Sequence, residues 1–565
     1  MREKLESSIN RSDLFPGDKA TAARGYLQRA YCFFGRWNVF DWLVIFICLA
    51  SFGCSWIEAM VNYDSFHWGY LFGPVLDLKR GAVGHSEAFI GYGYVPVWIS
   101  SVALSVFGER LMSIGMITGL FYSLTLILSY LVFLRFLKKS LAFISVLFIF
   151  LIHPYMIYPG GNYFAYTFLL AALIFFMRYP GNPYNGLGAG FFLCLSVLSR
   201  YSSVIAVLPP FIILLGWEFL TAQDSRKPLI KKIGLISAGF FVPLILFFTY
   251  LAANSALDDF FFQNQMMAQQ WGRLDDANTY LNFLAFIVQI EKSSYAYDFR
   301  GRIFSLILLV CLWVIIRDII RRVSHSPAPS EYATYDVVAV CLVTVFGFLN
   351  SLHVYETFRL VNGASIGVGV CVLVFYNFFL KAAKPFKYLL AILSLGIFLF
   401  LSSSLFFQQT SSAYFPWNKD VLLHKGVTNN TIGLFKGKLL TREYNNFYQS
   451  IYDAVAPFKG RCYILNYTND GIALLINDLP RVQIVPNFHP WFEDLEKQAR
   501  LIDRHETVIL SYKRLDLPGY KEIFAENWPE EIPWLSGGCL FIYAPRQYTD
   551  DNRKSPVQNN DNTNI

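Results

Sequence analysis

Apolar runs of membrane-spanning length recur along the first 407 residues and constrain the fold more than any other feature of the sequence. The first run, residues 41–60, would form a helix about 30 Å long, which matches the thickness of a bilayer core. Further runs lie near residues 111–134, 141–158, 163–177, 186–199, 203–220, 232–253, 303–321, 336–353, 361–380 and 386–407. These runs predict a polytopic α-helical membrane protein with about eleven transmembrane helices.

Composition agrees with a membrane protein and excludes two other classes. Hydrophobic residues make up 55% of the chain and charged residues 15%, a ratio that is wrong for a soluble enzyme. The net charge of +7 could suggest a nucleic-acid partner. The basic residues, however, stand in short clusters between the apolar runs, where they orient membrane helices. We therefore expect no nucleic-acid partner.

The basic clusters also predict the orientation of the chain. With the N-terminus in the cytoplasm, the clusters follow the even-numbered runs, which places them on the cytoplasmic side. They comprise Arg135, Lys138, Lys139, Arg178, Arg226, Lys227, Lys231, Lys232, Arg317, Arg321, Arg322, Lys381, Lys384 and Lys387. An odd number of spans then puts the C-terminal part outside a plasma membrane, in the periplasm or the extracellular space.

These signals divide the chain into four predicted parts. They are a cytoplasmic segment (1–40), a transmembrane domain (41–407) with exterior loops 61–110 and 254–302, an exterior α/β domain (408–545), and a disordered tail (546–565). A short amphipathic run over 95–106 predicts a helix at the membrane interface inside the first loop. Short β-rich runs at 461–466, 506–511 and 539–543 predict the strands of the exterior domain. Cys462 and Cys539 either form a disulfide there or remain two buried thiols.

The first exterior loop carries the strongest candidates for chemistry. Asp64 lies just beyond the first apolar run, where apolar walls and Trp68 would raise the pKa of its carboxyl group. It could then take a proton from a hydroxyl nucleophile, with His67 on the same helix face. The alternatives are an N-cap for a helix and a hydrogen-bonding neighbour. Trp68 and Asp77 are predicted to contact substrate.

A second group in this loop has the composition of a cation site. His85 and Glu87 follow closely on Asp77, and oxygen and nitrogen ligands of this kind could hold Mg²⁺ or Mn²⁺. Such an ion would neutralise a leaving phosphate. Contacts to the acceptor are the other interpretation of the same side chains.

Two short exterior connections break the charge pattern. Arg200 is followed by Tyr201, and Arg359 is followed three residues later by Asn362. An outward-facing arginine at the end of a span opposes the predicted orientation, so we expect a compensating interaction. A phosphate is one candidate, because a guanidinium group holds it through two hydrogen bonds. An ion pair between Arg359 and Glu356, or contact with lipid headgroups, is the alternative.

The loop and the topology together resemble the GT-C superfamily of membrane glycosyltransferases. The loop pattern Asp64-x-x-His67-x-Gly69, then Pro74-x-Leu-Asp77-x-x-x-Gly81, then Tyr92-Gly93, is similar to that of a poorly characterised bacterial group. The resemblance implies a polyprenyl-phosphate-linked sugar as donor and a role for Asp64 as general base or metal ligand. It also implies a second acid in a later exterior loop, for which Asp258 and Asp259 are the candidates.

These observations predict a glycosyltransferase that modifies a cell-envelope glycan, a lipid or a protein on the outer face of the membrane. The Asp-Glu pair of protein O-mannosyltransferases and the WWD-type motif of oligosaccharyltransferases are both absent, which disfavours a protein acceptor. A transporter or flippase for lipid-linked sugars is the first alternative, although the predicted spans carry few charges at their centres. A glycan polymerase and a non-enzymatic envelope scaffold are the others.

Overall fold

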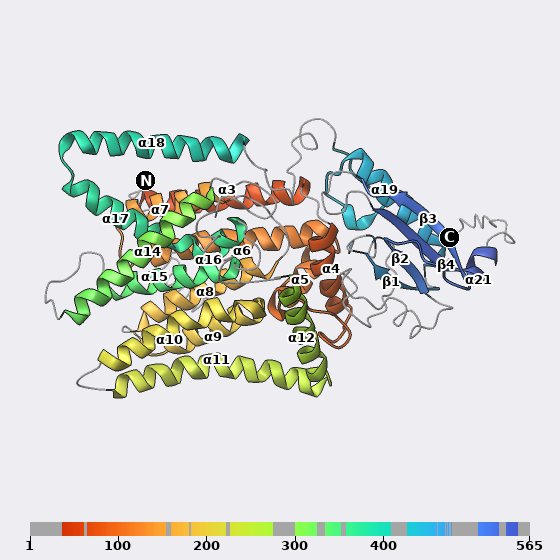
Figure 1. Cartoon of the computed structure of the whole chain (residues 1–565), viewed down its shortest axis with the longest axis horizontal. Helices are drawn as coiled ribbons and strands as arrows, with labels where there is room; N and C mark the ends of the chain where they lie inside the picture. The colour runs from red at the N-terminus through yellow and green to blue at the C-terminus, as the bar shows by residue number, and fades with distance from the viewer. Residues whose placement is uncertain are drawn as a thin grey trace, which may run out of the picture.

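The computed structural model describes most of the chain. The described residues are 37–61, 65–153, 160–179, 182–221, 226–274, 300–324, 334–351, 357–407, 426–459, 461–468, 471, 473, 476, 507–529 and 538–551. Figure 1 shows a helix bundle with a small α/β domain at one end. We call this end of the bundle, next to the C-terminal domain, the domain end.

Every predicted apolar run falls on a helix. The helices are α3 (Val39–Val61), α6 (Leu111–Phe133), α7 (Lys139–Ile152), α8 (Gly161–Met177), α9 (Asn185–Ser199), α10 (Val204–Thr221), α11 (Lys227–Ala253), α14 (Arg300–Val323), α15 (Tyr335–Gly347), α16 (Thr357–Ala364), α17 (Val368–Lys381) and α18 (Lys384–Phe407). Seven helical segments in the described part are long and apolar enough to cross a membrane, and α7, α8, α9 and the α15 segment are shorter. The prediction of a multi-pass helical membrane protein is confirmed.

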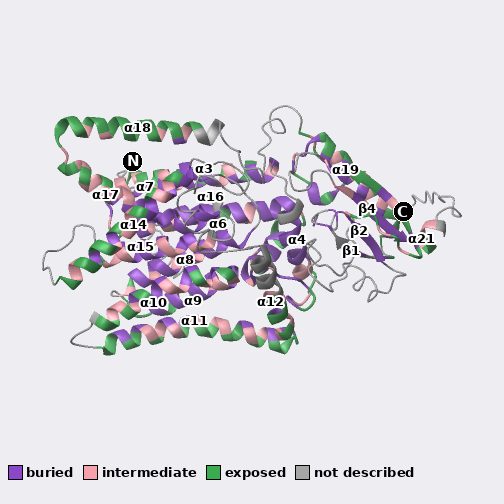
Figure 2. Ribbon diagram, viewed as in Figure 1, coloured by how far each residue is buried: buried purple, intermediate pink, exposed green. Residues whose placement is uncertain are grey.

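The pattern of buried and exposed apolar side chains is that of a protein in a bilayer rather than in water. The inner faces of α6 and α8 are almost wholly buried, whereas α18 has apolar side chains exposed along most of its length (Figure 2). Glycines allow the closest helix contacts. A Cβ atom at Gly190 of α9 would stand 2.0 Å from the carbonyl oxygen of Ile236, and one at Gly239 would stand 2.2 Å from that of Leu187. These two positions hold α9 against α11.

The domain end is more helical than the sequence predicts. The first exterior loop contains α4 (Ser65–Lys79) in addition to the predicted interfacial helix, which is α5 (Tyr94–Phe107). The second exterior loop begins with α12 (Leu257–Leu274). In Figure 1, α4, α5 and α12 lie together between the bundle and the C-terminal domain. The structure therefore brings both predicted loops to one place.

The C-terminal domain combines α19 (Arg442–Val455) with a four-stranded sheet. Strands β1 (Tyr463–Tyr467), β2 (Thr507–Ser511), β3 (Tyr520–Asn527) and β4 (Cys539–Pro545) have the order β1-β2-β4-β3. The pair β1–β2 is parallel and the other pairs are antiparallel. The sequence predicts three of these strands and misses β3, whose alternation is weak. Of the two alternatives for Cys462 and Cys539, the structure has the thiols. A short helix, α21 (Arg546–Asp551), follows the domain where a disordered tail is predicted.

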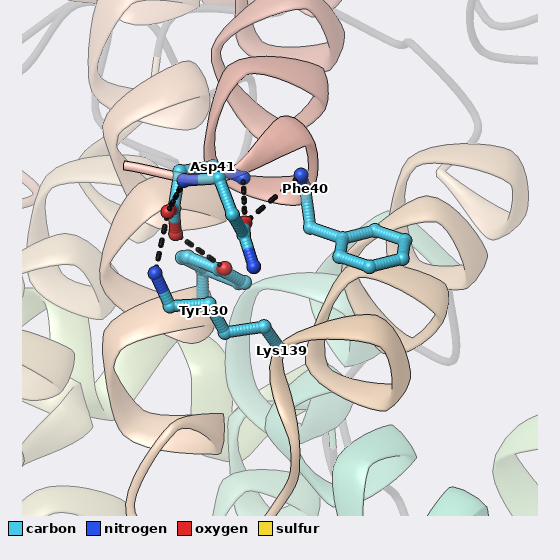
Figure 3. Close-up of polar contacts among 5 residues, drawn as sticks. Phe40, Asp41, Tyr130 and Lys139 are labelled. Atoms are coloured by element: carbon cyan, nitrogen blue, oxygen red, sulfur yellow. Dashed lines mark hydrogen bonds and ion pairs between the residues drawn. The ribbon is translucent and has the colours of Figure 1, made fainter. Parts of the chain in front are cut away.

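A polar cluster closes the far end of α3, away from the domain end (Figure 3). Asn38 and Asp41 cap the helix reciprocally: the Asp41 carboxylate accepts from the Asn38 backbone, and the Asn38 side chain accepts from the backbone of Phe40 and Asp41. The Asp41 carboxylate also accepts hydrogen bonds from Tyr130 at 2.7 Å and Lys139 at 2.6 Å. These contacts join α3 to α6 and α7.

This cluster gives a measurable coupling between helices. Lys139 retains 38% exposure and Asp41 12%, so water screens the ion pair in part. We expect a double-mutant cycle of Asp41→Asn and Lys139→Gln to give a coupling of about 0.5–1 kcal/mol in detergent unfolding experiments. The replacement Arg110→Gln serves as a control, because its guanidinium group donates to the nearby Phe107 carbonyl oxygen, away from this cluster. Strictly additive effects of the two replacements would contradict this role.

Candidate functional site

Arg200 lies at the C-terminal end of α9, buried with only 4% exposure. Its guanidinium group donates to the side chain of Asn162, the second residue of α8. Two glycines make this approach feasible. A Cβ atom at Gly161 would stand 2.3 Å from the Ser199 carbonyl oxygen, and one at Gly93 would stand 2.4 Å from the same atom. The turn that carries Arg200 is thus packed between α8 and the start of α5.

Arg359 and Asn362 lie on α16, and both are buried. The backbone departs from helical geometry at Asn362, where φ is −87° and ψ is 26°. Gly347 and Gly363 lie so close that a Cβ atom on the former would stand 2.0 Å from the carbonyl oxygen of the latter. This short helix packs on α8 and on the end of α15.

The segments that carry Arg200 and Arg359 lie together. The turn after Arg200, η2 (Tyr201–Ser203), contacts η3 (Phe348–Ser351), which precedes α16. Both arginine-bearing segments also contact α8, through Asn162 in one case and through the packing of α16 in the other. The two exceptions to the charge pattern therefore converge on one end of the bundle.

Arg300 is a third buried arginine in this part of the bundle, and the sequence analysis does not single it out. Helix α14 contacts α16 and α17, and a Cβ atom at Gly367, just before α17, would stand 2.5 Å from Ile307 of α14. Arg300 begins α14 and Arg359 lies on α16, so the contact between these helices brings the segments of both arginines to one region. Arg300 keeps 9% exposure. Its position at the start of an apolar run is the signal that could have indicated it.

His153 adds a fourth nitrogen-rich side chain to this region. It is fully buried at the end of α7, and its ring lies 3.7 Å from that of Tyr122 between centroids, with the two planes tilted by 36°. The charge of Arg300 acts on its imidazole, which places the two side chains near each other. Guanidinium groups can hold an anion through paired hydrogen bonds, so these arginines are candidates for an anion site.

His85 joins three elements around this site. Its Nδ1 atom lies 2.9 Å from the Oε1 atom of Gln263 on α12, and its Nε2 atom lies 3.0 Å from the Tyr201 hydroxyl. Gln263 Nε2 donates to the His85 carbonyl oxygen, which fixes Oε1 as the acceptor. In the neutral ring, Nδ1 therefore carries the proton and Nε2 accepts from Tyr201. Tyr201 also donates its backbone N–H to Tyr92.

The surroundings of His85 keep its ring neutral. Burial lowers the pKa of His85 from 6.5 to about 4, although the hydrogen bond to Gln263 and the charge of Asp259 act in the opposite direction. The side chain is completely buried, with the ring of Phe260 4.9 Å away between centroids. The Asp259 carboxylate, one candidate for the second acid, thus lies near this loop.

The predicted metal ligands His85 and Glu87 make hydrogen bonds within the protein. Both ring nitrogens of His85 already have protein partners. The exposed Glu87 uses Oε2 to accept from the Val83 backbone at 2.7 Å and closes a turn. Among the residues that the structure describes, no three His, Cys, Asp or Glu side chains gather closely enough to hold an ion. His85 and Glu87 therefore act as hydrogen-bonding groups in this structure.

The remaining candidates of the first loop have different placements. Asp64 lies outside the described residues, and the structure describes His67 only as part of helix α4. Trp68 is fully buried, with the Lys438 ammonium 3.9 Å from its ring centroid, so its indole packs against protein. Asp77 is half-buried near the end of α4, where its carbonyl oxygen accepts from Arg80 and Ala82.

Comparisons with known proteins give only distant similarities. No protein family model matches the chain, and no curated relative matches it. The oligosaccharyltransferase AglB from Archaeoglobus fulgidus, solved with an inhibitory peptide and a dolichol-phosphate, is 11% identical over 80% of this chain and 62% of its own, with a TM-score of 0.46. Apo ArnT from Cupriavidus metallidurans is 10% identical over 83% and 93%, with a TM-score of 0.48. ArnT bound to undecaprenyl phosphate is 11% identical over 74% and 70%, with a TM-score of 0.42. The chain thus spans less than two thirds of AglB.

The neutral state of His85 predicts a pH dependence of stability. Its folded-state pKa lies below the unfolded value of 6.5, so the unfolded chain binds a proton first as the pH falls. The contribution is complete above about pH 6.5 and is lost between 6.5 and 4, by about 3 kcal/mol in all. The thermal midpoint of the wild type should fall through this window more steeply than that of His85→Gln, which cannot titrate. Parallel curves would contradict the assignment.

Proposed function

We propose that the protein is a membrane glycosyltransferase that moves a sugar from a polyprenyl-phosphate donor to a hydroxyl acceptor. The observation that carries this proposal is the contact between the segments of three buried arginines: those of Arg200 and Arg359 meet through η2 and η3, and α14, which begins at Arg300, contacts α16. Guanidinium groups hold a phosphate through paired hydrogen bonds, and a lipid-linked phosphate can reach a site between membrane helices. The resemblance of the first loop to the GT-C superfamily supports the same activity.

The proposed reaction is a single displacement at the anomeric carbon of the donor sugar. The acceptor hydroxyl attacks this carbon on the side opposite the phosphate, and the bond from the carbon to the phosphate oxygen breaks as the new glycosidic bond forms. The hydroxyl proton passes to the carboxylate of Asp64, assisted by His67. Polyprenyl phosphate leaves with the electron pair, and the configuration inverts.

The arginines are proposed to stabilise the phosphate leaving group in this reaction. Negative charge develops on the phosphate as its bond to the sugar breaks, and positive groups held in advance stabilise that charge more than they stabilise the donor. Arg200 and Arg359 are the proposed primary contacts, with Arg300 as a third cation. Tyr201 and Asn362 lie beside them, and Asp77 is a proposed contact of the sugar or the acceptor. Trp68 has a packing role in this scheme because it is fully buried.

No step is assigned to a divalent cation. The described residues His85 and Glu87 are engaged in protein hydrogen bonds, so a Mg²⁺ or Mn²⁺ ion would need other ligands. The acceptor is proposed to approach from the side of the C-terminal domain, which lies beyond α4 at one end of the bundle (Figure 1). A cell-envelope glycan, a lipid or a protein could each present a hydroxyl group from there.

One prediction of this mechanism concerns the general base. We expect Asp64→Asn to lower the rate of sugar transfer from a labelled polyprenyl-phosphate donor by about a hundredfold or more, because the amide cannot accept the proton. Asp516→Asn is the matched control, since Asp516 is an exposed acid of the C-terminal domain. Both variants should be made in the full-length chain and compared at equal membrane expression. Wild-type transfer by Asp64→Asn would contradict the proposal, and movement of the donor between leaflets without transfer would favour a flippase.

Another prediction of this mechanism concerns the phosphate contacts. Arg200→Lys and Arg359→Lys retain the charge but lose the paired hydrogen bonds, so each should lower kcat/KM for the donor by about tenfold, mainly through kcat. Arg302→Lys is the control, because this exposed arginine lies two residues from the buried Arg300. Transfer should be measured over a range of donor concentrations. An unchanged kcat/KM in both buried variants would contradict the phosphate contacts.

A further inference from the structure

Lys438 of the C-terminal domain is a fully buried lysine in a turn that follows η6 (Gly433–Phe435). Gly437 precedes it with a φ of 88°, a left-handed conformation that suits glycine, and this turn directs the chain toward the bundle. The Nζ atom donates to the Ala59 carbonyl oxygen of α3 at 2.7 Å. The same atom lies over the indole of Trp68 on α4, 3.9 Å from the ring centroid.

This contact closes the C-terminal end of α3. The last carbonyl groups of a helix have no partner within the helix, and they carry the negative end of its dipole. Helix α3 has no basic residue of its own in the last turn. Lys438 supplies the cation from 379 residues away, and the backbone N–H of Leu439 donates to the Met60 carbonyl oxygen at 2.9 Å. The C-terminal domain therefore caps the first membrane helix.

A lysine is a costly choice for a residue that only attaches two domains. Burial of an ammonium group is unfavourable by several kcal/mol before its new contacts are counted, and an apolar side chain of similar size would pack there at lower cost. Two contacts of the ammonium group are directional: it donates to one carbonyl oxygen and lies over the face of a tryptophan ring, the aromatic side chain that attracts cations most strongly. The ammonium group thus specifies the relative position of α3 and α4.

The two contacts of Lys438 flank one short segment of chain. Ala59 and Trp68 are separated in sequence by residues 60–67, which include Asp64. Ala59 and Trp68 both pack on α6 at Gly115. A Cβ atom there would stand 2.5 Å from the Ala59 methyl group and 2.9 Å from the Trp68 ring. Any movement of Lys438 therefore changes the two ends of this segment together.

We propose that Lys438 is a positioning residue that fixes the end of α3 and the start of α4 relative to each other, and so holds α4 of the first exterior loop in the arrangement needed for catalysis. The catalytic part of this proposal rests on the glycosyltransferase function proposed above, whereas the positioning part does not. The C-terminal domain then contributes to the reaction by fixing the loop through one side chain. Removal of the ammonium group should affect the chemical step more than donor binding.

The test compares Lys438→Met, Lys438→Arg and the control Lys436→Met in the full-length protein in lipid nanodiscs. Lys436 is exposed and lies two residues away, so its replacement leaves the buried contacts intact. The first readout is hydrogen exchange of a peptide that covers residues 59–68. Lys438→Met should accelerate exchange there by about tenfold or more, while Lys438→Arg and Lys436→Met should stay within about twofold of the wild type.

The second readout is transfer from the polyprenyl-phosphate donor. Lys438→Met should lower kcat by about tenfold or more with a KM for the donor within about threefold of the wild type, and Lys438→Arg should restore kcat. Unchanged exchange in Lys438→Met would overturn the proposal, as would an equal acceleration in Lys438→Arg. Accelerated exchange with an unchanged kcat would overturn the catalytic part. A wild type that transfers no sugar, with exchange as expected, would reject the proposed function but leave the positioning role.

A further variant keeps the test decisive if Lys438→Met does not fold. In Gly115→Ala, the added methyl group would press on Ala59 and Trp68 from the opposite side without touching Lys438. It should also accelerate exchange over residues 59–68. Gly216→Ala is its control, since a Cβ atom there meets no other atom within 4 Å. Protection of the segment in Gly115→Ala equal to that in the wild type would overturn the inference.

Discussion

The capping of α3 by Lys438 is the interaction on which the arrangement of the domain end depends. It joins the first membrane helix, the first exterior loop and the C-terminal domain in one buried contact. Asp41 and its partners close the other end of the same helix. Acid at the N-terminus and base at the C-terminus both complement the helix dipole, and in each case partners come from other elements. Helix α3 is thus held at both ends by charges inside an otherwise apolar bundle.

At the domain end, several buried polar side chains have defined hydrogen-bond partners. Arg200 is held by Asn162, and His85 is held by Gln263 and Tyr201. In an apolar environment, each such contact is stronger than it would be in water, and each also restricts the geometry. The result is a set of directional contacts at the domain end, one of which holds Arg200. Contacts of this kind suit a reaction in which positive charge must be in place before the leaving group departs.

The helices and most strands could be predicted from sequence because their signals are local. Each apolar run became a helix, and three of the four strands follow short β-rich runs. The errors have identifiable reasons. Helix α4 contains glycines and Pro74, residues that are typical of loops, so its sequence predicts a loop. Strand β3 alternates weakly and carries several charged residues, so it lacks the usual pattern of a strand.

The sequence by itself determined that this is a polytopic helical membrane protein, and it marked Arg200 and Arg359 as exceptions to the charge pattern. Hydrophobic length and charge distribution act locally, so they can be read along the chain. The tertiary structure decided which distant segments lie together: α14, which begins at Arg300, contacts α16, which carries Arg359; His85 bonds to Gln263 and Tyr201; and Lys438 reaches α3. These outcomes depend on burial and on contacts between remote segments, and no local pattern encodes either.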